Sequence, residues 1–510
     1  MHGGPCVWDM TNWMTIYLPR SLSPIVDFNQ LWDEEESLFT KGFDKYSIVP
    51  LLHPQHPDIA DNKARRWRMG MAALSEGTFF NRPNYQPDTP YTVKYRDPIF
   101  DVLQSSEAHV KSELDIMRSH PYHAKSKIFF VGGDGLAIMR INTILARQGA
   151  AAEYLMKAPA VVPVQGEHPH GTCHVLHMGW RPYWPLLEPM LKGIGHTWMK
   201  KEFKVSDFNQ YDFVMCILIA GIAKYLHKIA AAGHKNVYLG DSFGEACAVN
   251  PDLNWMFHFL HDHGMGGTLS LSVCVCVCVC VCVCATHMRI AANIHMESGI
   301  SVGGHGVGFL YWQFRQSVRG NDGPTIDLLW RECVSFMHTS VSNKTQYAPM
   351  AIMRIFWAEA LHPAIAEVYQ RARTLSMTGM GGSNVGWDML AEHENLLIKA
   401  ICTSFDREKI TALVRQLTFT SVVASGLEKA ILKDKRASPG LHKEIERDVD
   451  KLAAWIESKL GATFDLAAVS RGARIVKSGE KPWEAVAKVV ASGNWDTWAR
   501  EHLRTKVPWM

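Results

Sequence analysis

The sequence predicts an α/β protein with a small mixed or parallel sheet, extensive helical insertions and a helical C-terminal region. Two apolar runs, Ile128–Val131 and Val161–Val164, are short enough to form buried strands. Between them, Leu136–Gln148 has the apolar spacing of a helix, and Gly149 is a natural stop for that helix. The order strand, helix, strand predicts that the two strands are parallel neighbours.

The 510 residues divide into three predicted regions. Residues 1–90 form an N-terminal region of uncertain structure, because aromatic and proline-rich segments alternate there without defining a core. Residues 91–400 form the α/β core, which reads as mostly helical beyond Glu167 and includes a long helix over Gln210–Ala232. Residues 401–510 form a charged, helical C-terminal region.

The composition is typical of a globular protein, with 47% hydrophobic and 20% charged residues. The net charge of +3 is near neutral, so contact with a nucleic acid would require a local basic patch. The N-terminus lacks the layout of a signal peptide, and the apolar segment Phe213–Ala223 is too short to span a bilayer. We therefore expect no membrane partner. Outside one repeat the cysteines form no CxxC pair, so we expect a reduced, intracellular compartment.

One low-complexity tract interrupts the core. Leu269–Cys284 reads LSLSVCVCVCVCVCVC, which is the translation of a CT repeat followed by a GT repeat. An uncharged, β-prone alternation of this kind is prone to aggregate when it is exposed. We interpret the tract as a translated microsatellite insertion without function, and expect its deletion to leave folding intact or improved.

Acidic residues follow both predicted strands. Asp134 comes directly after the first strand in the sequence GGDG, and Glu167 follows the second strand in the sequence QGEH. In open α/β sheets, ligands bind in the crevice at the carboxyl ends of the strands. Asp134 and Glu167 are therefore candidates for a shared site.

A third acidic segment lies in Asn384–Ala400. On a helix, Asp388, Glu392, Asn395 and Lys399 fall at positions i, i+4, i+7 and i+11, which form one stripe. Such a stripe could present two carboxylates and an amide to a cleft. From spacing alone, a solvated face held by pairs of the Glu392–Lys399 type is the favoured alternative.

These segments resemble a group of eukaryotic, transposon-derived proteins of largely unknown function that are related to DDE-type transposases. Three blocks within residues 90–400 carry the resemblance: Gly133-Asp134 followed by a helix, the PVQGEH block Pro163–His168, and the D-x-x-x-E-H-x-N pattern of Asp388, Glu392, His393 and Asn395. The chain departs from the family pattern at Glu167, where aspartate is usual, and it lacks a recognisable N-terminal DNA-binding module.

The resemblance implies an RNase H-like core in which Asp134, Glu167 and Glu392 hold Mg²⁺, with Mn²⁺ as a substitute. Two such ions about 4 Å apart would promote cleavage or strand transfer at a phosphodiester. Supporting roles fall to His168, Asp388, His393 and Asn395. DNA is then the expected partner and the nucleus an expected location.

Three other readings stay open. The chain could be a catalytically inactive, domesticated protein that binds DNA or another protein. A cluster of five side chains, His168, His170, Cys173, His174 and His177, has the ligand types of a zinc-dependent hydrolase. The Gly132–Gly135 loop also resembles the nucleotide-binding loop of nucleotide and lipid kinases, in which glycines let the backbone approach phosphates.

Overall fold

The structure is a computed structural model, and the part of the chain that it describes consists of residues 6–7, 44–54, 56–81, 128–133, 160–165, 167, 171–180, 184–202, 207–233, 307–339, 347–371, 373–375, 382, 384–386, 388, 439–460 and 492–506. Several sequence predictions fall outside these residues: Asp134, His168, Glu392, His393, Asn395, the helix at 136–148 and the Val-Cys tract.

A small mixed sheet contains the two predicted strands. Its order is β1 (Cys6–Val7), β2 (Ile128–Gly133) and β3 (Ala160–Gln165). The predicted parallel pairing of β2 with β3 is present, in a register that runs from Ile128 opposite Ala160 to Gly133 opposite Gln165. β1 adds an antiparallel edge to β2. The apolar residues of β3 drive this arrangement, since Val162 and Val164 are fully buried.

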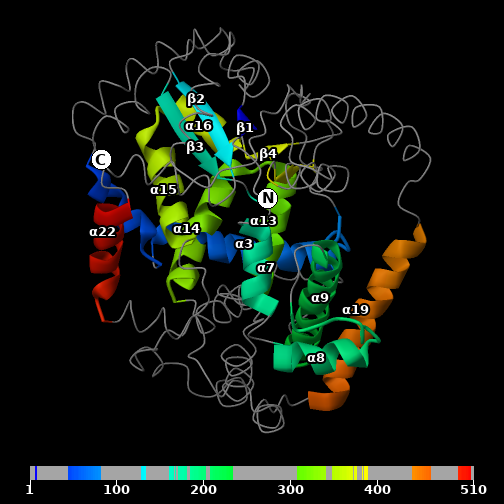
Figure 1. The fold of residues 1–510 in the computed structure, drawn as a ribbon. Coiled ribbons are helices and arrows are strands. Elements are labelled where there is room, and N and C mark those ends of the chain that lie inside the picture. The colour runs from blue at the N-terminus through cyan, green and yellow to red at the C-terminus, as the bar shows by residue number, and fades with distance from the viewer. Residues whose placement is uncertain are drawn as a thin grey trace, which may run out of the picture.

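A group of helices forms the centre of the molecule (Figure 1). They are α3 (Pro57–Ser75), α13 (Val307–Gly320), α14 (Gly323–Thr339), α15 (Tyr347–Ala360) and α16 (Pro363–Arg371). α15 packs against α14 and β3, and α3 packs against both α13 and α14. A short antiparallel pair, β4 (Thr374–Leu375) with β5 (Val385–Gly386), follows α16.

The turn between α13 and α14 is fixed by two polar residues. Asn321 has a φ of 55°, a left-handed conformation that asparagine tolerates better than most residues. Asp322 then accepts a hydrogen bond of 3.2 Å from the main-chain N–H of Thr325, which caps the start of α14. The turn therefore fixes the direction in which α14 begins relative to the end of α13.

A second group of helices extends from the centre of the molecule, at α7, to the side opposite α15 and α22 (Figure 1). It consists of α7 (Cys173–Trp180), α8 (Trp184–Gly193), α9 (Phe208–Gly233) and α19 (Pro439–Leu460). α9 lies against α19, while α22 (Asn494–Lys506) contacts α15 and the 3-10 helix η2 (Lys45–Ile48). No helix in the described ranges has an apolar stretch long enough to cross a bilayer.

One hydrophobic core connects segments from all three predicted regions. It includes Ile48 from the first region, Trp330 and Trp357 from the second, and Leu452 and Leu503 from the third. Each of these side chains is buried, so the N- and C-terminal segments contribute apolar burial to the same core as the central helices.

Candidate carboxylate site at the ends of the parallel strands

The parallel pairing places the two predicted strand-end acids at one edge of the sheet. Gly133 and Gln165 are partners at the carboxyl ends of β2 and β3. Asp134 is the next residue after Gly133, and Glu167 lies two residues beyond Gln165. The chain therefore leaves both strands at the same edge, where open α/β sheets bind ligands.

The structure also brings Asp388 to this edge. The main-chain N–H of Glu167 donates a hydrogen bond of 3.1 Å to Oδ1 of Asp388, and both residues are buried. Asp388 follows β5 and begins the third acidic segment of the sequence. The second and third sequence blocks are thus in direct contact. The contact is made by Asp388, for which the resemblance implies only a supporting role.

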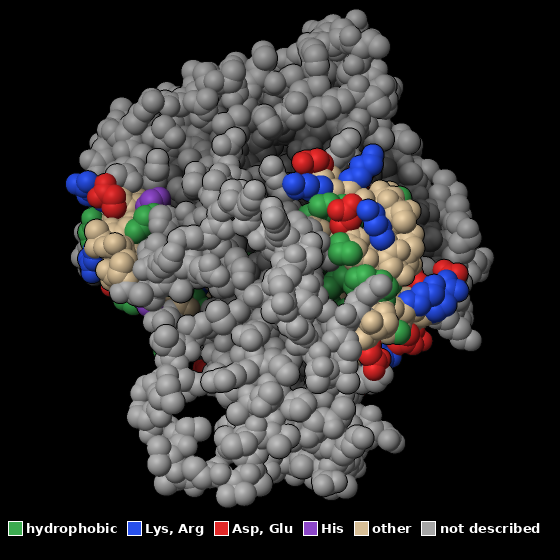
Figure 2. Space-filling model, turned by 90° about the horizontal axis from the view of Figure 1, so that it is seen from below, with side chains coloured by type: hydrophobic (Ala, Val, Ile, Leu, Met, Phe, Trp, Pro, Cys, Tyr) green, Lys and Arg blue, Asp and Glu red, His purple; other side chains and the backbone are tan. Residues whose placement is uncertain are grey.

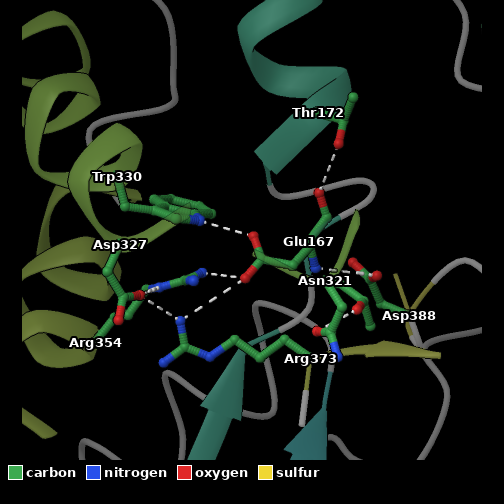
Figure 3. Close-up of polar contacts among 9 residues, drawn as sticks. Glu167, Thr172, Asn321, Asp327, Trp330, Arg354, Arg373 and Asp388 are labelled. Atoms are coloured by element: carbon green, nitrogen blue, oxygen red, sulfur yellow. Dashed lines mark hydrogen bonds and ion pairs between the residues drawn. The ribbon is translucent and has the colours of Figure 1, made fainter. Parts of the chain in front are cut away.

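The side chain of Glu167 points toward the helices and is completely buried (Figure 3). Its Oε2 accepts a hydrogen bond of 2.8 Å from the indole N–H of Trp330 in α14. Its Oε1 contacts Nη1 of Arg354 in α15, and Nη1 of Arg373 lies 3.8 Å from the same oxygen. Both carboxylate oxygens of Glu167 are therefore already engaged by protein N–H groups.

Asp327 completes a buried network of four charges. Its Oδ1 lies 2.5 Å from Nε of Arg354 and 2.8 Å from Nη1 of Arg373. With Glu167, the network contains two carboxylates and two guanidinium groups, so its formal charges cancel. Burial lowers the pKa of Arg373, but Tyr369, Asp327 and Glu167 together raise it above the ordinary value, so Arg373 stays protonated. Such balance is what allows charges to be buried at all.

Two contacts fix the main chain at Glu167. Its carbonyl oxygen accepts hydrogen bonds from the N–H of Thr172, at 2.8 Å, and from the Thr172 hydroxyl, at 3.0 Å. A Cβ at Gly171 would lie 2.7 Å from the ring of Phe314, so only glycine allows this close approach. These contacts fix Glu167 relative to the residues directly before α7, Gly171 and Thr172.

Sequence reasoning missed Asp327, Arg354 and Arg373. One signal was available: Arg354 is the only basic residue in the largely apolar helix α15, and a charge within such a helix is seldom buried without a partner. Nothing in the local spacing names Asp327 or Arg373 as the partners.

The residues at this site fit the implied magnesium only in part. Mg²⁺ requires oxygen ligands with available lone pairs, whereas both oxygens of Glu167 face N–H donors and the side chain is fully buried. Within the described ranges, no group of three or more His, Cys, Asp or Glu side chains is placed to hold a metal ion. Asp134 and Glu392 lie outside those ranges, so their metal-binding role stays a prediction.

The structure describes only a few residues of the two other candidate sites, the zinc cluster and the GGDG loop. Of the proposed zinc cluster, Cys173 is buried at the start of α7, while the four histidine side chains lie outside the described residues. Of the GGDG loop, Gly132 and Gly133 form the end of β2, and the remaining two residues are not described. Both readings stay predictions.

No protein-family model, curated protein or solved structure matches this chain significantly. The likeness to transposon-derived proteins therefore depends on the three short sequence blocks and on what the geometry adds to them.

A second buried polar cluster joins α3 to α13 and α14. Arg66 forms two hydrogen bonds of 2.8 Å with the carboxylate of Glu332, and Nη1 of Arg66 also donates to Gln313 at 3.2 Å. Lys63 is buried beside this pair. The pKa of Lys63 is lowered to about 8, because burial and the positive charge of Arg66 lower it by more than the carboxylate of Glu332 raises it. This cluster holds α3 against α13 and α14.

Proposed function

We propose that this chain is an RNase H-like, transposase-derived protein that processes DNA with Mg²⁺ bound at the carboxyl edge of β2 and β3. The observation that supports the proposal is that one residue of each block, Gly133, Glu167 and Asp388, lies at this edge. β2 and β3 are parallel partners, and the hydrogen bond from Glu167 to Asp388 adds the third block. An edge of this kind is where open α/β folds bind ligands.

In this proposal, Asp134 and Glu392 hold the metal and Asp388 lies beside them. Glu392 is four positions after Asp388, so on a helix both carboxylates occupy the same face. Mg²⁺, when bound, supplies activation of the attacking oxygen and stabilisation of the leaving oxygen of a phosphodiester. Asp388 has one oxygen engaged by the N–H of Glu167, which orients its carboxylate without help from a metal.

DNA contact would come from local patches. Figure 2 shows one face, on which the described side chains of both charge signs are interspersed. Because the net charge of +3 is near neutral, we expect weak, salt-dependent binding of DNA outside the site.

A cleavage assay tests this function. The full chain is incubated with supercoiled plasmid and with single- and double-stranded oligonucleotides, with Mg²⁺, with Mn²⁺ or with EDTA. We expect metal-dependent nicking or strand transfer that is lost in Asp134→Asn and in Glu392→Gln. Glu188→Gln is the matched control, because Glu188 makes an exposed ion pair with Lys192 in α8, away from the strand ends. Equal activity in all variants would reject the proposed site.

A second candidate function is favoured by one observation. Since N–H donors engage both oxygens of Glu167, the chain could be a domesticated protein that keeps the fold and binds DNA without cleaving it. That function predicts DNA binding that is unchanged by EDTA and by Asp134→Asn, together with no cleavage under any metal condition. Gel-shift and cleavage assays on the same protein preparation separate the two functions.

A further inference from the structure

We propose that Glu167 is a positioning residue whose carboxylate serves as a buried counter-ion for Arg354, and that it is not a metal ligand. Its side chain anchors the end of β3 to α14 and α15, while its main chain holds Asp388 in place. The second half of this inference, which concerns the metal, rests on the proposed function. The first half does not.

The contacts of the carboxylate carry the first step. Trp330 donates to Oε2 at 2.8 Å, and Arg354 contacts Oε1. Arg354 also lies over the ring of Trp330, with its guanidinium carbon 5.3 Å from the ring centre. The carboxylate is therefore enclosed by two donors that themselves pack together, and a metal could reach Glu167 only by displacing one of them.

The charge balance carries the second step. Asp327 pairs with both Arg354 and Arg373, so Glu167 is the fourth charge that makes the network neutral. Within the described residues, three donors of this network, Nη2 of Arg354 and Nε and Nη2 of Arg373, have no hydrogen-bond partner, against one acceptor, Oδ2 of Asp327. The network already has more donors than acceptors, so loss of the Glu167 charge would leave a buried guanidinium uncompensated.

The main-chain contacts of Glu167 support its role in positioning Asp388. The N–H of Glu167 binds Asp388, and its carbonyl binds Thr172 (Figure 3). A residue locked at its side chain by α14 and α15 thus presents its N–H in a fixed direction. The packing of two helices thereby determines where the third acidic segment begins at the strand edge.

Glu167→Gln tests the counter-ion role in metal-free buffer. The glutamine amide would direct its NH₂ group at either the indole N–H of Trp330 or the guanidinium of Arg354, both of which are donors. We expect the melting temperature to fall by roughly 5 °C, or soluble yield to collapse. The double variant Glu167→Gln with Arg354→Met removes both charges and leaves Arg373 paired with Asp327. We expect it to be clearly more stable and more soluble than the single variant.

The same proteins test the metal role through stability alone. If Glu167 only positions the site, the double variant keeps the Mg²⁺-dependent rise in melting temperature that the wild type shows. If Glu167 is a ligand, Glu167→Gln preserves or raises metal-free stability, and both variants lose the Mg²⁺-dependent rise. That result, or a double variant no more stable and soluble than the single one, would overturn the inference. A wild type without any Mg²⁺-dependent rise would count against the proposed function only, because the metal-free comparison still decides the counter-ion role.

Discussion

The main-chain N–H of Glu167 binds Oδ1 of Asp388 at 3.1 Å, although 221 positions separate the two residues in the chain. This bond joins the segment after β3 to the segment after β5 at the carboxyl edge of the parallel strands. It joins a residue of the second sequence block to the first residue of the third block, so the role of Asp388 can be tested directly.

Asp388→Asn separates the charge of this residue from its hydrogen bond. The asparagine oxygen can still accept from Glu167, so we expect the metal-free melting temperature to stay close to that of the wild type. The Mg²⁺ concentration for half-maximal stabilisation should rise by about tenfold or more, as for other residues that orient metal ligands.

Asp388→Ala is the companion variant. It also removes the acceptor, leaves a buried N–H unsatisfied, and should reduce the free energy of unfolding by about 1–3 kcal/mol. Thermal unfolding across a Mg²⁺ titration checks both variants. Equal Mg²⁺ midpoints in Asp388→Asn and the wild type would exclude Asp388 from the metal environment.

The buried pair of Arg66 and Glu332 should contribute strongly to stability. Arg66→Met leaves the Glu332 carboxylate buried without its two hydrogen bonds of 2.8 Å from the guanidinium. We expect a loss of about 3–5 kcal/mol in urea unfolding, and partial recovery when Glu332→Gln is added. Lys192→Ala, which breaks an exposed pair with Glu188, is the control and should cost less than about 1 kcal/mol. A loss for Arg66→Met as small as that of the control would contradict the prediction.

Lys63 should make the stability depend on alkaline pH. Its pKa is lowered by burial to about 8, whereas an unfolded lysine titrates near about 10.4. Between these values the unfolded state binds more protons, so the contribution of Lys63 to the free energy of unfolding rises with pH and is lost as pH falls toward 8. The full change is about 3 kcal/mol.

The measurement compares the wild type with Lys63→Met from about pH 7.5 to about pH 10.5. Other groups oppose the effect, since burial raises the pKa of the Cys216 thiol to about 12, but they contribute equally to both proteins. We expect the difference in free energy of unfolding, wild type minus variant, to increase as pH rises. A constant difference would show that Lys63 titrates normally.

Gly221 should control how closely α9 approaches α19. A Cβ at this position would lie 2.6 Å from Cδ2 of Leu452, which is fully buried. Gly221→Ala gains about 1 kcal/mol of helix propensity but should lose about 1–3 kcal/mol to overpacking. We expect a net loss of stability in thermal unfolding.

Leu452→Ala relieves the contact. Alone, it should cost about 2–5 kcal/mol by creating a cavity. Combined with Gly221→Ala, the total loss should be smaller than the sum of the single losses, because the added methyl fills part of the space that Leu452 leaves. Additive losses within about 0.5 kcal/mol would show that the two helices move apart freely at this contact.

The sequence by itself determined the local features of this protein. Ile128–Val131 and Val161–Val164 are short apolar runs, and the intervening helical pattern was enough to predict that β2 and β3 are parallel partners. The same reasoning placed Glu167 at the carboxyl end of β3. These features follow from the periodicity of neighbouring residues, which sequence shows directly.

Only the tertiary structure decided what the Glu167 side chain does. Its partners Trp330 and Arg354 are 163 and 187 positions away, and no local spacing connects them to it. A buried carboxylate must be paired, but helix packing selects the partner. The same holds for Asp388, whose contact with Glu167 depends on β4 and β5 returning the chain to the sheet edge. The resemblance implies that Glu167 is a metal ligand, but the fold surrounds its carboxylate with N–H donors from two arginines and a tryptophan that are distant in the sequence.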